Sequence, residues 1–389
     1  MKVASICHMF PNRVQPHVGV FVKERLKHVA EKTDLTMIAP VPSFPFMERL
    51  EKYRGLKGLE ETEMLEGLLV HHPRYFVIPR YLKWLDARFY GHSMASYIEL
   101  LTRRHDFDIF DFHWVYPDGI GGLEWARRLG KKTVVTVRGN EAIYFFDDCP
   151  MRRIVQKHLK EFDHVISVSQ DLKNKVVDEY GVDPSRVTVI SNGIDCGKFH
   201  PVDREGARRG CGVESGERAV LTVSRLSSEK GLDHLLKAIA RLDDASLTLT
   251  IAGDGPLRAT LTALAERLGI AGRVRFLGNL DHGGLCSWYN AADIFCLPSL
   301  WEGCPNVVIE ALACGTPVVA SRVGGIPDLV PEPECGVLVT PGDEVALAAG
   351  LEEALRTRWN RSAISRHGSS NSWSEVADRV VGVFERVVS

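Results

Sequence analysis

The sequence predicts an α/β protein with two doubly wound parallel sheets, and three observations support this prediction. The chain has 389 residues, which is too long for one ordinary hydrophobic core and suits two domains. Short runs rich in Val and Ile alternate with amphipathic stretches, which is the pattern of parallel strands connected by helices. The alternation restarts after residues 192–195, and the restart indicates a second domain.

The individual elements follow from this alternation. In the first half we expect strands at residues 2–7, 35–38, 109–113, 133–137, 164–168 and 187–190, and in the second half at 219–223, 247–252, 274–277, 294–297, 317–320 and 337–339. A linker is expected within 198–216, where no clear period is found, and a last amphipathic helix at 373–388. The predicted domains are residues 1–198 and 199–372.

The composition describes a globular protein and excludes several classes. Charged residues make up 25% of the chain and apolar residues 45%, with a net charge of −2 and no block dominated by Lys and Arg, so nucleic-acid binding is not expected. No run of about 20 apolar residues is present, and the apolar run at 3–7 is too short for a signal peptide. The nine cysteines show no Cys-x-x-Cys pair or zinc spacing, which favours a reduced, cytoplasmic location without a disulfide framework.

Two glutamates in the second half flank a Gly-Cys-Pro-Asn turn. Glu302 and Glu310 are eight residues apart, and Pro305 lies where the first residue of a helix prefers to be, so we expect a helix over 305–314. The backbone N–H groups at the start of this helix suit phosphate or sugar oxygens, and the carboxylates suit vicinal hydroxyls on a ribose and a hexose. The alternative is that Glu310 forms a cap or salt bridge and Glu302 is solvated.

Other loops that follow predicted strands carry candidate ligand groups, because ligands bind outside the carboxyl ends of strands in open parallel sheets. Arg225 and Lys230 are five residues apart between a strand and a helix, and a pyrophosphate would suit them. Two solvated loop cations are the other interpretation. Gly253 ends the next strand, either as a tight turn or for a close approach of backbone to ligand.

In the first half, polar groups also follow predicted strands. Gly19 precedes a predicted helix over 20–30 and allows either the approach of a ligand or a turn. His113 follows one strand, and Arg138 begins the sequence Arg-Gly-Asn-Glu after the next strand. The segment 41–59 mixes aromatic and basic residues, which favours a mobile loop at an anionic lipid surface or a plain surface loop.

Taken together, these motifs resemble a family-4 retaining glycosyltransferase of the GT-B fold, the group-1 glycosyl transferases, which include bacterial polysaccharide and cell-envelope enzymes. The motifs in order are Ser224-Arg225, Lys230-Gly231, Gly253-Asp254-Gly255, Glu302 with Glu310, and Gly324-Gly325. The resemblance covers nearly the whole chain and is more specific in its second half. It implies two Rossmann-like domains facing each other across a deep cleft, with the nucleotide held mainly by the second domain and the acceptor mainly by the first. The terminal helix, about 373–389, would cross back to the first domain.

The resemblance also implies roles for individual residues. Arg225 and Lys230 would neutralise the donor diphosphate with Gly19 approaching it, Glu310 would hold the ribose, and Glu302 would hold the donor sugar. The other donor-binding residues would be Gly253, Asn279, Leu280, Gly303, Cys304, Pro305 and Asn306. No metal or other cofactor is implied, since two cations and helix dipoles can compensate the charge of the leaving diphosphate. Asp147 and Asp148 are adjacent and do not form an Asp-x-Asp metal motif.

The sequence departs from the family at one informative place. Many members have His-Gly-x-Asp where this chain has Arg138-Gly139-Asn140-Glu141. Arginine cannot act as a base, but it can clamp an anion. We therefore expect Arg138 to contact the donor diphosphate or an anionic acceptor, and His113 to be the neutral contact of the reacting sugar or acceptor. His113, Arg138 and Glu302 are the candidate catalytic residues, with neither glutamate acting as the general base.

The expected function is transfer of a hexosyl group from a nucleoside-diphosphate sugar, linked to UDP or GDP, to a glycan or lipid-linked glycan, with retention of configuration. Synthesis of exopolysaccharide or cell-envelope polysaccharide is the expected role, in the cytoplasm or peripherally on the inner face of the cell membrane through the first domain. A transferase for a small-molecule acceptor or sugar phosphate would share every donor residue. A non-catalytic nucleotide-sugar-binding protein is a further alternative, and a dehydrogenase is disfavoured because no Gly-x-Gly-x-x-Gly follows either first strand.

Overall fold

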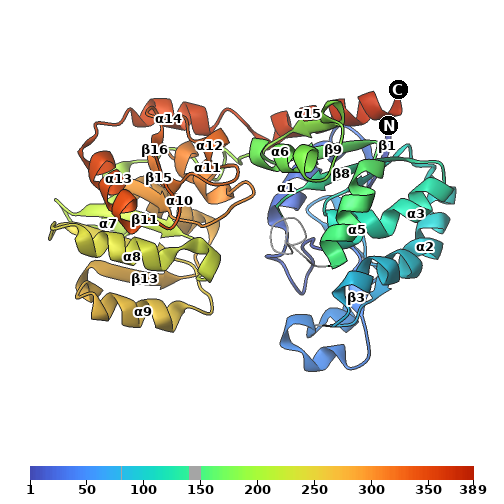
Figure 1. Ribbon diagram of the computed structural model, residues 1–389, viewed down its shortest axis with the longest axis horizontal. Helices are drawn as coiled ribbons and strands as arrows, with labels where there is room; N and C mark the ends of the chain where they lie inside the picture. The colour runs from blue at the N-terminus through green and yellow to red at the C-terminus, as the bar shows by residue number, and fades with distance from the viewer. Residues whose placement is uncertain (80, 140–149) are drawn as a thin grey trace. The chain divides into compact units, whose positions relative to one another are not determined.

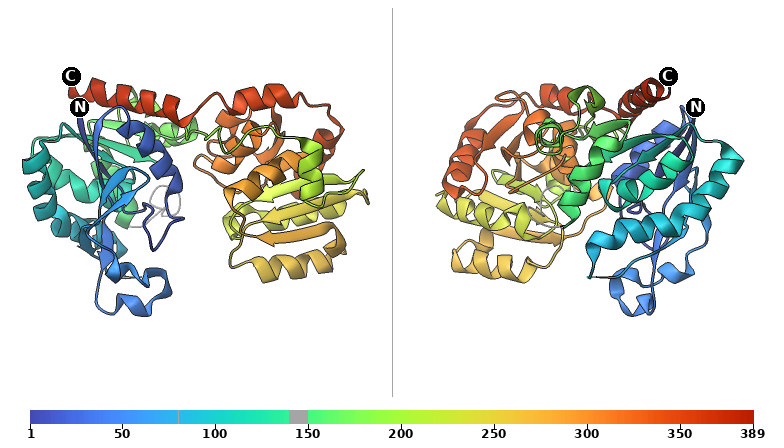
Figure 2. Two further views of the ribbon diagram at one scale, coloured as in Figure 1. Left: turned by 180° about the vertical axis from the view of Figure 1, so that it is seen from behind. Right: turned by 45° about the vertical axis from the view of Figure 1, so that its right-hand side comes forward.

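The computed structural model describes residues 1–79, 81–139 and 150–389, which divide into two compact units. Unit 1 contains Met1–Asn192 and Trp373–Ser389, and unit 2 contains Gly193–Ser372. Both ends of the chain lie in unit 1, as Figures 1 and 2 show. Unit 2 is therefore inserted, in the sequence, between the two parts of unit 1.

Unit 1 is built on a sheet with the strand order β10-β9-β8-β7-β1-β2-β5-β4, in which all pairs are parallel except β4 with β5. The strands are β1 (Lys2–Ile6), β2 (Asp34–Ile38), β4 (Thr62–Leu65), β5 (Leu68–His71), β7 (Ile109–Phe112), β8 (Lys132–Val137), β9 (His164–Ser167) and β10 (Val187–Val189). The six strands predicted for this half are confirmed to within about one residue at each end. The short strands β4 and β5 were not predicted.

Helices cover both faces of this sheet. Helix α15 (Trp373–Val388) packs beside α1 (Val20–Ala30), and a buried apolar stripe from Trp373 to Phe384 joins the core between these helices and the sheet. On the other face, Phe110 and Phe112 of β7 pack against Trp125 of α3 (Ile120–Arg128), which lies beside α2 (Asp86–His105). Unit 1 also contains α5 (Pro150–His158) and α6 (Gln170–Asp178). The predicted terminal helix is thus part of the core of unit 1.

The segment 41–59, expected to be a mobile or plain surface loop, has an apolar cluster of its own. It contains β3 (Val41–Ser43), which pairs with β6 (Arg74–Phe76), and three short 3-10 turns. Val41, Met47 and Leu56 are buried together. Glu48 accepts hydrogen bonds from the backbone N–H groups of Gly55 and Lys57, which closes the turns on one another. These contacts hold the segment in an ordered fold.

Unit 2 is built on a six-stranded, fully parallel sheet with the order β13-β12-β11-β14-β15-β16. The strands are β11 (Arg218–Val223), β12 (Leu247–Ala252), β13 (Val274–Gly278), β14 (Ile294–Leu297), β15 (Val318–Ser321) and β16 (Gly336–Val339), which confirms the six predicted strands. Helices α8 (Leu232–Arg241), α9 (Arg258–Arg267) and α13 (Glu344–Arg356) share one core with the sheet. The other core is shared by α10 (His282–Ala291), α11 (Asn306–Ala313), α12 (Ile326–Leu329) and α14 (Arg361–Gly368).

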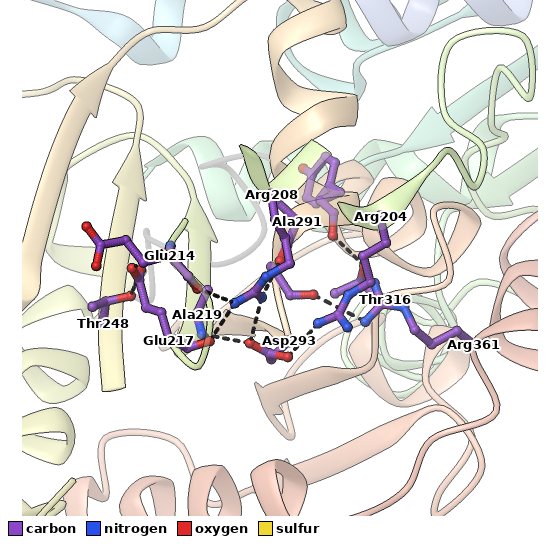
Figure 3. Close-up of polar contacts among 12 residues, drawn as sticks. Arg204, Arg208, Glu214, Glu217, Ala219, Thr248, Ala291, Asp293, Thr316 and Arg361 are labelled. Carbon is purple, nitrogen blue, oxygen red and sulfur yellow. Dashed lines mark hydrogen bonds and ion pairs between the residues drawn. The ribbon is translucent and has the colours of Figure 1, made fainter. Parts of the chain in front are cut away.

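The predicted linker within 198–216 is wrong, because this segment is built into unit 2. It contains α7 (Arg204–Gly210), which packs against α10. Arg204 and Arg208 both bind the carboxylate of Asp293, at 2.5 and 3.2 Å, and Asp293 also accepts a hydrogen bond from the backbone N–H of Ala219 on β11 (Figure 3). Helix α7 was not predicted because its residues are mostly polar, so its sequence shows no apolar period. The boundary lies instead between Asn192 and Gly193.

Candidate functional site

The candidate ligand loops of unit 2 gather at one edge of its sheet, because all six strands are parallel and their carboxyl ends meet there. Of these loops, 224–231 follows β11 and 298–305 follows β14, and the two strands are direct neighbours. The backbone N–H of Leu300 donates to the carbonyl of Glu229, which ties the two loops together at 2.8 Å. Sequence positions about 70 residues apart therefore form one surface.

Lys230 and Glu302 are joined in this surface. The Lys230 Nζ donates to Glu302 Oε1 at 2.7 Å, and the Ser299 hydroxyl donates to the same oxygen at 2.7 Å. Glu302 is 7% exposed, so a lone carboxylate there would be costly, and the ammonium group compensates its charge. The alternative of a solvated Glu302 is therefore wrong. The pair places a cation beside a carboxylate that can accept hydrogen bonds from hydroxyl groups.

The loop after β15 fixes the backbone of Glu302. Gly324 has a φ of +53°, and a Cβ atom at this position would lie 1.8 Å from the carbonyl oxygen of Glu302. Only glycine satisfies both the left-handed backbone and this close approach. The backbone N–H of Gly325 donates to the carbonyl of Gly303 at 2.9 Å, which completes the contact between the loops.

The predicted site glycines Gly19 and Gly253 likewise lie against protein backbone. A Cβ at Gly19, whose φ is +64°, would lie 1.9 Å from the carbonyl oxygen of Met9 in unit 1. A Cβ at Gly253 would lie 2.0 Å from the carbonyl oxygen of Ser224 in unit 2. Close packing of the chain on itself is therefore sufficient reason for glycine at both positions.

Glu310 lies one and a half turns into α11 and has a different environment from Glu302. Tyr289, which is fully buried on α10, donates its hydroxyl to Glu310 Oε2 at 2.9 Å. Burial among apolar neighbours raises the pKa of Glu310 to about 7, and the tyrosine hydrogen bond offsets only part of that effect. The carboxyl group thus titrates near neutral pH, and its second oxygen has no hydrogen bond recorded among the described residues.

The remaining predicted donor residues lie around these groups in unit 2. Arg225 and Asn279 are exposed, and Leu280 packs partly against the core. Helix α11 begins at Asn306, one residue later than predicted, and Pro305 is the residue immediately before it. Gly303 and Pro305 are buried, and Cys304 and Asn306 are partly exposed. All of the donor residues predicted in the second half, from Arg225 to Glu310, therefore belong to one unit.

The predicted catalytic residues of unit 1, the buried His113 and the partly exposed Arg138, contact each other at the carboxyl ends of β7 and β8. Arg138 donates to Asn192 Oδ1 at 3.2 Å and to His113 Nδ1 at 3.1 Å, and its guanidinium lies 5.0 Å from the ring centre of Phe21. Asn140 and Glu141, which complete the predicted motif, lie outside the described residues. The neighbours that contact the side chain of Arg138 thus include Asn192, His113 and Phe21.

The contacts of His113 fix the protonation of its ring. Its side chain is fully buried, with Nδ1 accepting from Arg138 and Nε2 lying 2.9 Å from Asp111 Oδ2. Since arginine only donates, Nδ1 carries no proton and the ring is neutral with its proton on Nε2. Burial also lowers the pKa of His113 to about 4. His113 therefore lies where it can position Arg138, and its predicted contact with the reacting sugar stays a prediction.

Several residues of these sites were not predicted from sequence. They include Ser299 and Tyr289 beside the two glutamates, and a pair in unit 1, His8 and Asp118, whose side chains meet at 3.0 Å. His8 follows the first strand at the same sheet edge as His113 and Arg138, so the rule that was applied to the later strands would have selected it.

No cluster of three or more His, Cys, Asp or Glu side chains suited to a metal ion is found in the part of the chain that the structure describes. Asp147 and Asp148 lie outside it. Among the helices in the same described ranges, none is long and apolar enough to cross a membrane.

Comparison with family models matches both halves of the chain. Residues 203–370 match the model described as Glycosyl transferases group 1, and residues 18–198 match the model described as Glycosyltransferase Family 4. A D-inositol 3-phosphate glycosyltransferase from Mycobacterium bovis is 33% identical over 299 residues, which are 72% of this chain and 62% of the relative. The chain thus spans less than two thirds of that relative's length.

Solved structures share the fold over almost the entire chain. A sucrose-phosphate synthase from Thermosynechococcus elongatus superposes with a TM-score of 0.75 at 20% identity, covering 99% of this chain and 98% of the other. Anabaena Alr3699/HepE in complex with UDP superposes with a TM-score of 0.75 at 19% identity, covering 99% of both chains. At these identities the likeness concerns the fold.

Proposed function

Because the chain belongs to the family-4 glycosyltransferases of the GT-B fold, we propose that it transfers a hexosyl group from a nucleoside-diphosphate sugar to a glycan or lipid-linked glycan. The proposed role is in the synthesis of exopolysaccharide or cell-envelope polysaccharide. The donor would be linked to UDP or GDP and bound by unit 2, and the acceptor would be bound by unit 1.

The observation that carries this proposal is the contact of Lys230 with Glu302 at the carboxyl edge of the sheet in unit 2. A phosphate oxygen suits the ammonium group and the exposed Arg225 nearby, while sugar hydroxyls suit the carboxylate of Glu302. Glu310, eight residues later, offers a second carboxyl group for the ribose. The UDP complex of Alr3699/HepE, on the same fold, supports a uridine nucleotide as the first donor to test.

Thermal shift with UDP, GDP and ADP tests the donor assignment, because a ligand that binds only the folded state stabilises it by mass action. We expect one nucleotide to raise the melting temperature of the wild-type protein, and Lys230→Ala to remove most of this increase. Lys237→Ala is the matched control, since Lys237 on α8 also pairs with a carboxylate, Asp233, at 3.2 Å. An unchanged nucleotide response in Lys230→Ala would exclude the assignment.

We also propose that transfer retains the anomeric configuration and needs no metal ion. Arg225 and Lys230 would compensate the charge of the departing diphosphate, and a phosphate oxygen of the leaving group would take the proton of the acceptor hydroxyl on the same face. Proton NMR of the first product distinguishes retention from inversion. Turnover that is abolished by EDTA and restored by Mg²⁺ would contradict the role of the two cations.

An acceptor that carries a phosphate is the second candidate. The Mycobacterium relatives are named D-inositol 3-phosphate glycosyltransferases, and Arg138 provides a guanidinium group at the sheet edge of unit 1. A panel that pairs the donor with D-inositol 3-phosphate, with free sugars and with lipid-linked glycans separates the candidates. A phosphate-bearing acceptor should lose affinity in Arg138→Ala, whereas a neutral acceptor should not.

Peripheral contact with the inner face of the cell membrane through unit 1 is proposed from the segment 41–59. The aromatic ring of Phe46 is 72% exposed with the guanidinium of Arg49 above it, and three further exposed basic residues, Lys52, Arg54 and Lys57, follow. Exposed aromatic and basic groups together suit an anionic lipid surface.

Liposome flotation tests this contact. Replacing the four basic residues of 41–59 by serine should abolish flotation with vesicles that contain phosphatidylglycerol. The charge-matched control replaces four exposed arginines on α2 and α3, namely Arg103, Arg104, Arg127 and Arg128. Equal flotation of both variants would exclude this surface.

A further inference from the structure

A histidine and an aspartate that are 110 residues apart form a pair at the carboxyl edge of the sheet in unit 1. His8 follows β1, and Asp118 lies in the turn Val115–Gly119 after β7, the direct neighbour of β1. The His8 Nδ1 lies 3.0 Å from both carboxylate oxygens of Asp118, and the backbone N–H of His8 donates to Asp118 Oδ2 at 3.0 Å. The carboxylate is fully buried, while the His8 side chain is 20% exposed.

This geometry fixes the tautomer of the imidazole ring. A carboxylate only accepts hydrogen bonds, so the Nδ1 of His8 must carry a proton. In the neutral ring Nε2 is then an acceptor, and no hydrogen bond of Nε2 is recorded among the described residues. Asp118 therefore orients the His8 ring, and Nε2 is available to a ligand.

We propose that His8 holds the acceptor, its Nε2 accepting the hydrogen bond of the hydroxyl group that receives the sugar, and that Asp118 is the positioning residue that holds the proton of the neutral ring on Nδ1. The proposal rests on the proposed glycosyl transfer and names one side chain of unit 1 for its acceptor. His8 takes no proton in this role.

The surroundings of His8 favour a hydroxyl group over an anion. The buried carboxylate of Asp118 lies directly behind the ring, and Asp86 on α2 is close enough for an electrostatic interaction with His8. The carboxylate of Asp118 would repel a phosphate, whereas a hydroxyl donates to the imidazole without a charge. The indole ring of Trp114, partly exposed and 6.3 Å from the His8 ring, adds an aromatic surface of the kind on which the apolar face of a sugar can rest.

Arg138 provides a different group at the same sheet edge, two strands away from His8. His8 follows β1, Trp114 follows β7 and Arg138 follows β8, and these three strands are consecutive in the sheet. The imidazole of His8, the indole of Trp114 and the guanidinium of Arg138 therefore follow one another along the sheet edge. A sugar acceptor whose reactive hydroxyl binds His8 and whose anionic group binds Arg138 would fit this order.

The test compares His8→Ala, His8→Gln and Asp118→Asn with His158→Gln. His158 is the matched control, because its Nδ1 also lies 3.0 Å from a carboxylate, that of Glu161, and its side chain is 31% exposed. UDP binding, melting temperature and steady-state transfer are measured for each protein. The first substrates are UDP-glucose and D-inositol 3-phosphate, followed by the remaining donors and acceptors of the panel above.

We expect His8→Ala to lower kcat/KM for transfer by about 100-fold, the scale for loss of orientation of a nucleophile. UDP affinity and melting temperature should stay close to those of the wild type, and His158→Gln should be unaffected throughout. Transfer by His8→Ala within threefold of the wild-type rate would overturn the proposal. A parallel loss of UDP binding and of thermal stability would overturn it too, since His8 would then support the fold. A wild-type protein that binds no nucleotide and transfers no sugar would overturn the proposed function itself.

The tautomer of His8 measures the positioning role of Asp118, because a purely structural role would not affect it. In protein labelled with ¹⁵N-histidine, the His8 signals are assigned by their absence in His8→Gln. We expect the tautomer protonated at Nδ1 in the wild type. Asp118→Asn can present an amide N–H to Nδ1 and should move the proton to Nε2, with a loss of transfer that matches His8→Ala. A folded Asp118→Asn protein with unchanged tautomer and full transfer would contradict the positioning role.

Discussion

Two glutamates eight residues apart in unit 2 have opposite electrostatic environments. Glu302 is compensated by the ammonium group of Lys230 at 2.7 Å. Among the residues that the structure describes, Glu310 accepts a hydrogen bond from the hydroxyl of Tyr289, and burial raises the pKa of Glu310 to about 7. The same residue type is therefore ion-paired at one position and titrates near neutral pH at the other.

The raised pKa of Glu310 predicts a pH-dependent stability. The folded-state value of about 7 lies above the ordinary value of 4.5, so the bound proton stabilises the fold. This contribution is complete below pH 4.5 and is lost as the pH rises to about 7, with a total of about 3 kcal/mol. Urea unfolding from pH 4.5 to 8 should show the wild type losing stability relative to Glu310→Gln. Glu352→Gln, at an exposed carboxylate, should run parallel to the wild type.

The contact of Lys230 with Glu302 predicts separate effects on nucleotide and sugar. Lys230→Ala should weaken UDP binding by about tenfold, because it removes a charge-assisted contact with phosphate. Glu302→Gln should leave UDP binding unchanged or tighter, since a negative charge near the phosphates disappears, while kcat/KM for the nucleotide sugar falls by about 100-fold. Calorimetry with UDP and steady-state kinetics measure the two effects. Equal losses of UDP affinity in both variants would contradict the division of roles.

At the level of helices and loops, the anchorage of α7 depends on Asp293. This carboxylate binds Arg204 on α7 and the nearly buried Arg208, and it accepts the backbone N–H of Ala219 at the start of β11. Arg361 on α14 reaches the neighbouring carbonyl of Ala292 and the hydroxyl of Thr316 (Figure 3), and burial lowers its pKa to about 10. The end of the sheet opposite to the ligand loops is thus a charged structural junction.

Asp293→Ala should destabilise unit 2 by about 3 kcal/mol, because Arg208 would be left buried without its charge partner. Chemical denaturation followed by circular dichroism measures this loss. The exposed residue Asp243 supplies the control, and Asp243→Ala should change stability by no more than about 0.5 kcal/mol. A change of similar size in both variants would show that α7 is held mainly by other contacts.

The sequence was most informative where buried strands and local motifs dominate. The twelve central strands were predicted because each is a continuous apolar run covered on both faces. Their restart indicated two domains, and the GT-B fold was implied by the resemblance of the loop motifs to a known family. Strands β3 to β6 were missed because runs of three or four residues with exposed side chains carry little periodicity. The pair of His8 and Asp118 joins distant segments, and no local pattern reports such a contact.

For the whole molecule, α15 connects the end of the described chain to the first core. Six of its side chains are buried, namely Trp373, Val376, Ala377, Val380, Val383 and Phe384. They cover Val22, Leu26 and Val29 of α1 and the adjoining face of the sheet. Burial of apolar side chains of this size contributes about 1.5–3 kcal/mol each, which in sum approaches the stability of an ordinary domain.

A protein ending at Ser372 should therefore lose the cooperative unfolding of unit 1 and keep that of unit 2. Circular dichroism should show reduced helix content and one remaining thermal transition, which the nucleotide that stabilises the wild type still raises. Asp378→Ala, an exposed change on α15 that removes only the contact with Lys32, is the control. Two intact transitions in the shortened protein would show that α15 is dispensable for unit 1.

The insertion of unit 2 between the two parts of unit 1 also sets an order of events during translation. Every residue of unit 2 is synthesised before Trp373, so unit 2 can close its sheet while unit 1 still lacks a helix. Until α15 leaves the ribosome, the apolar face of α1 and its strands is open to water. Before α15 is synthesised, unit 1 thus exposes apolar surface that a chaperone could bind.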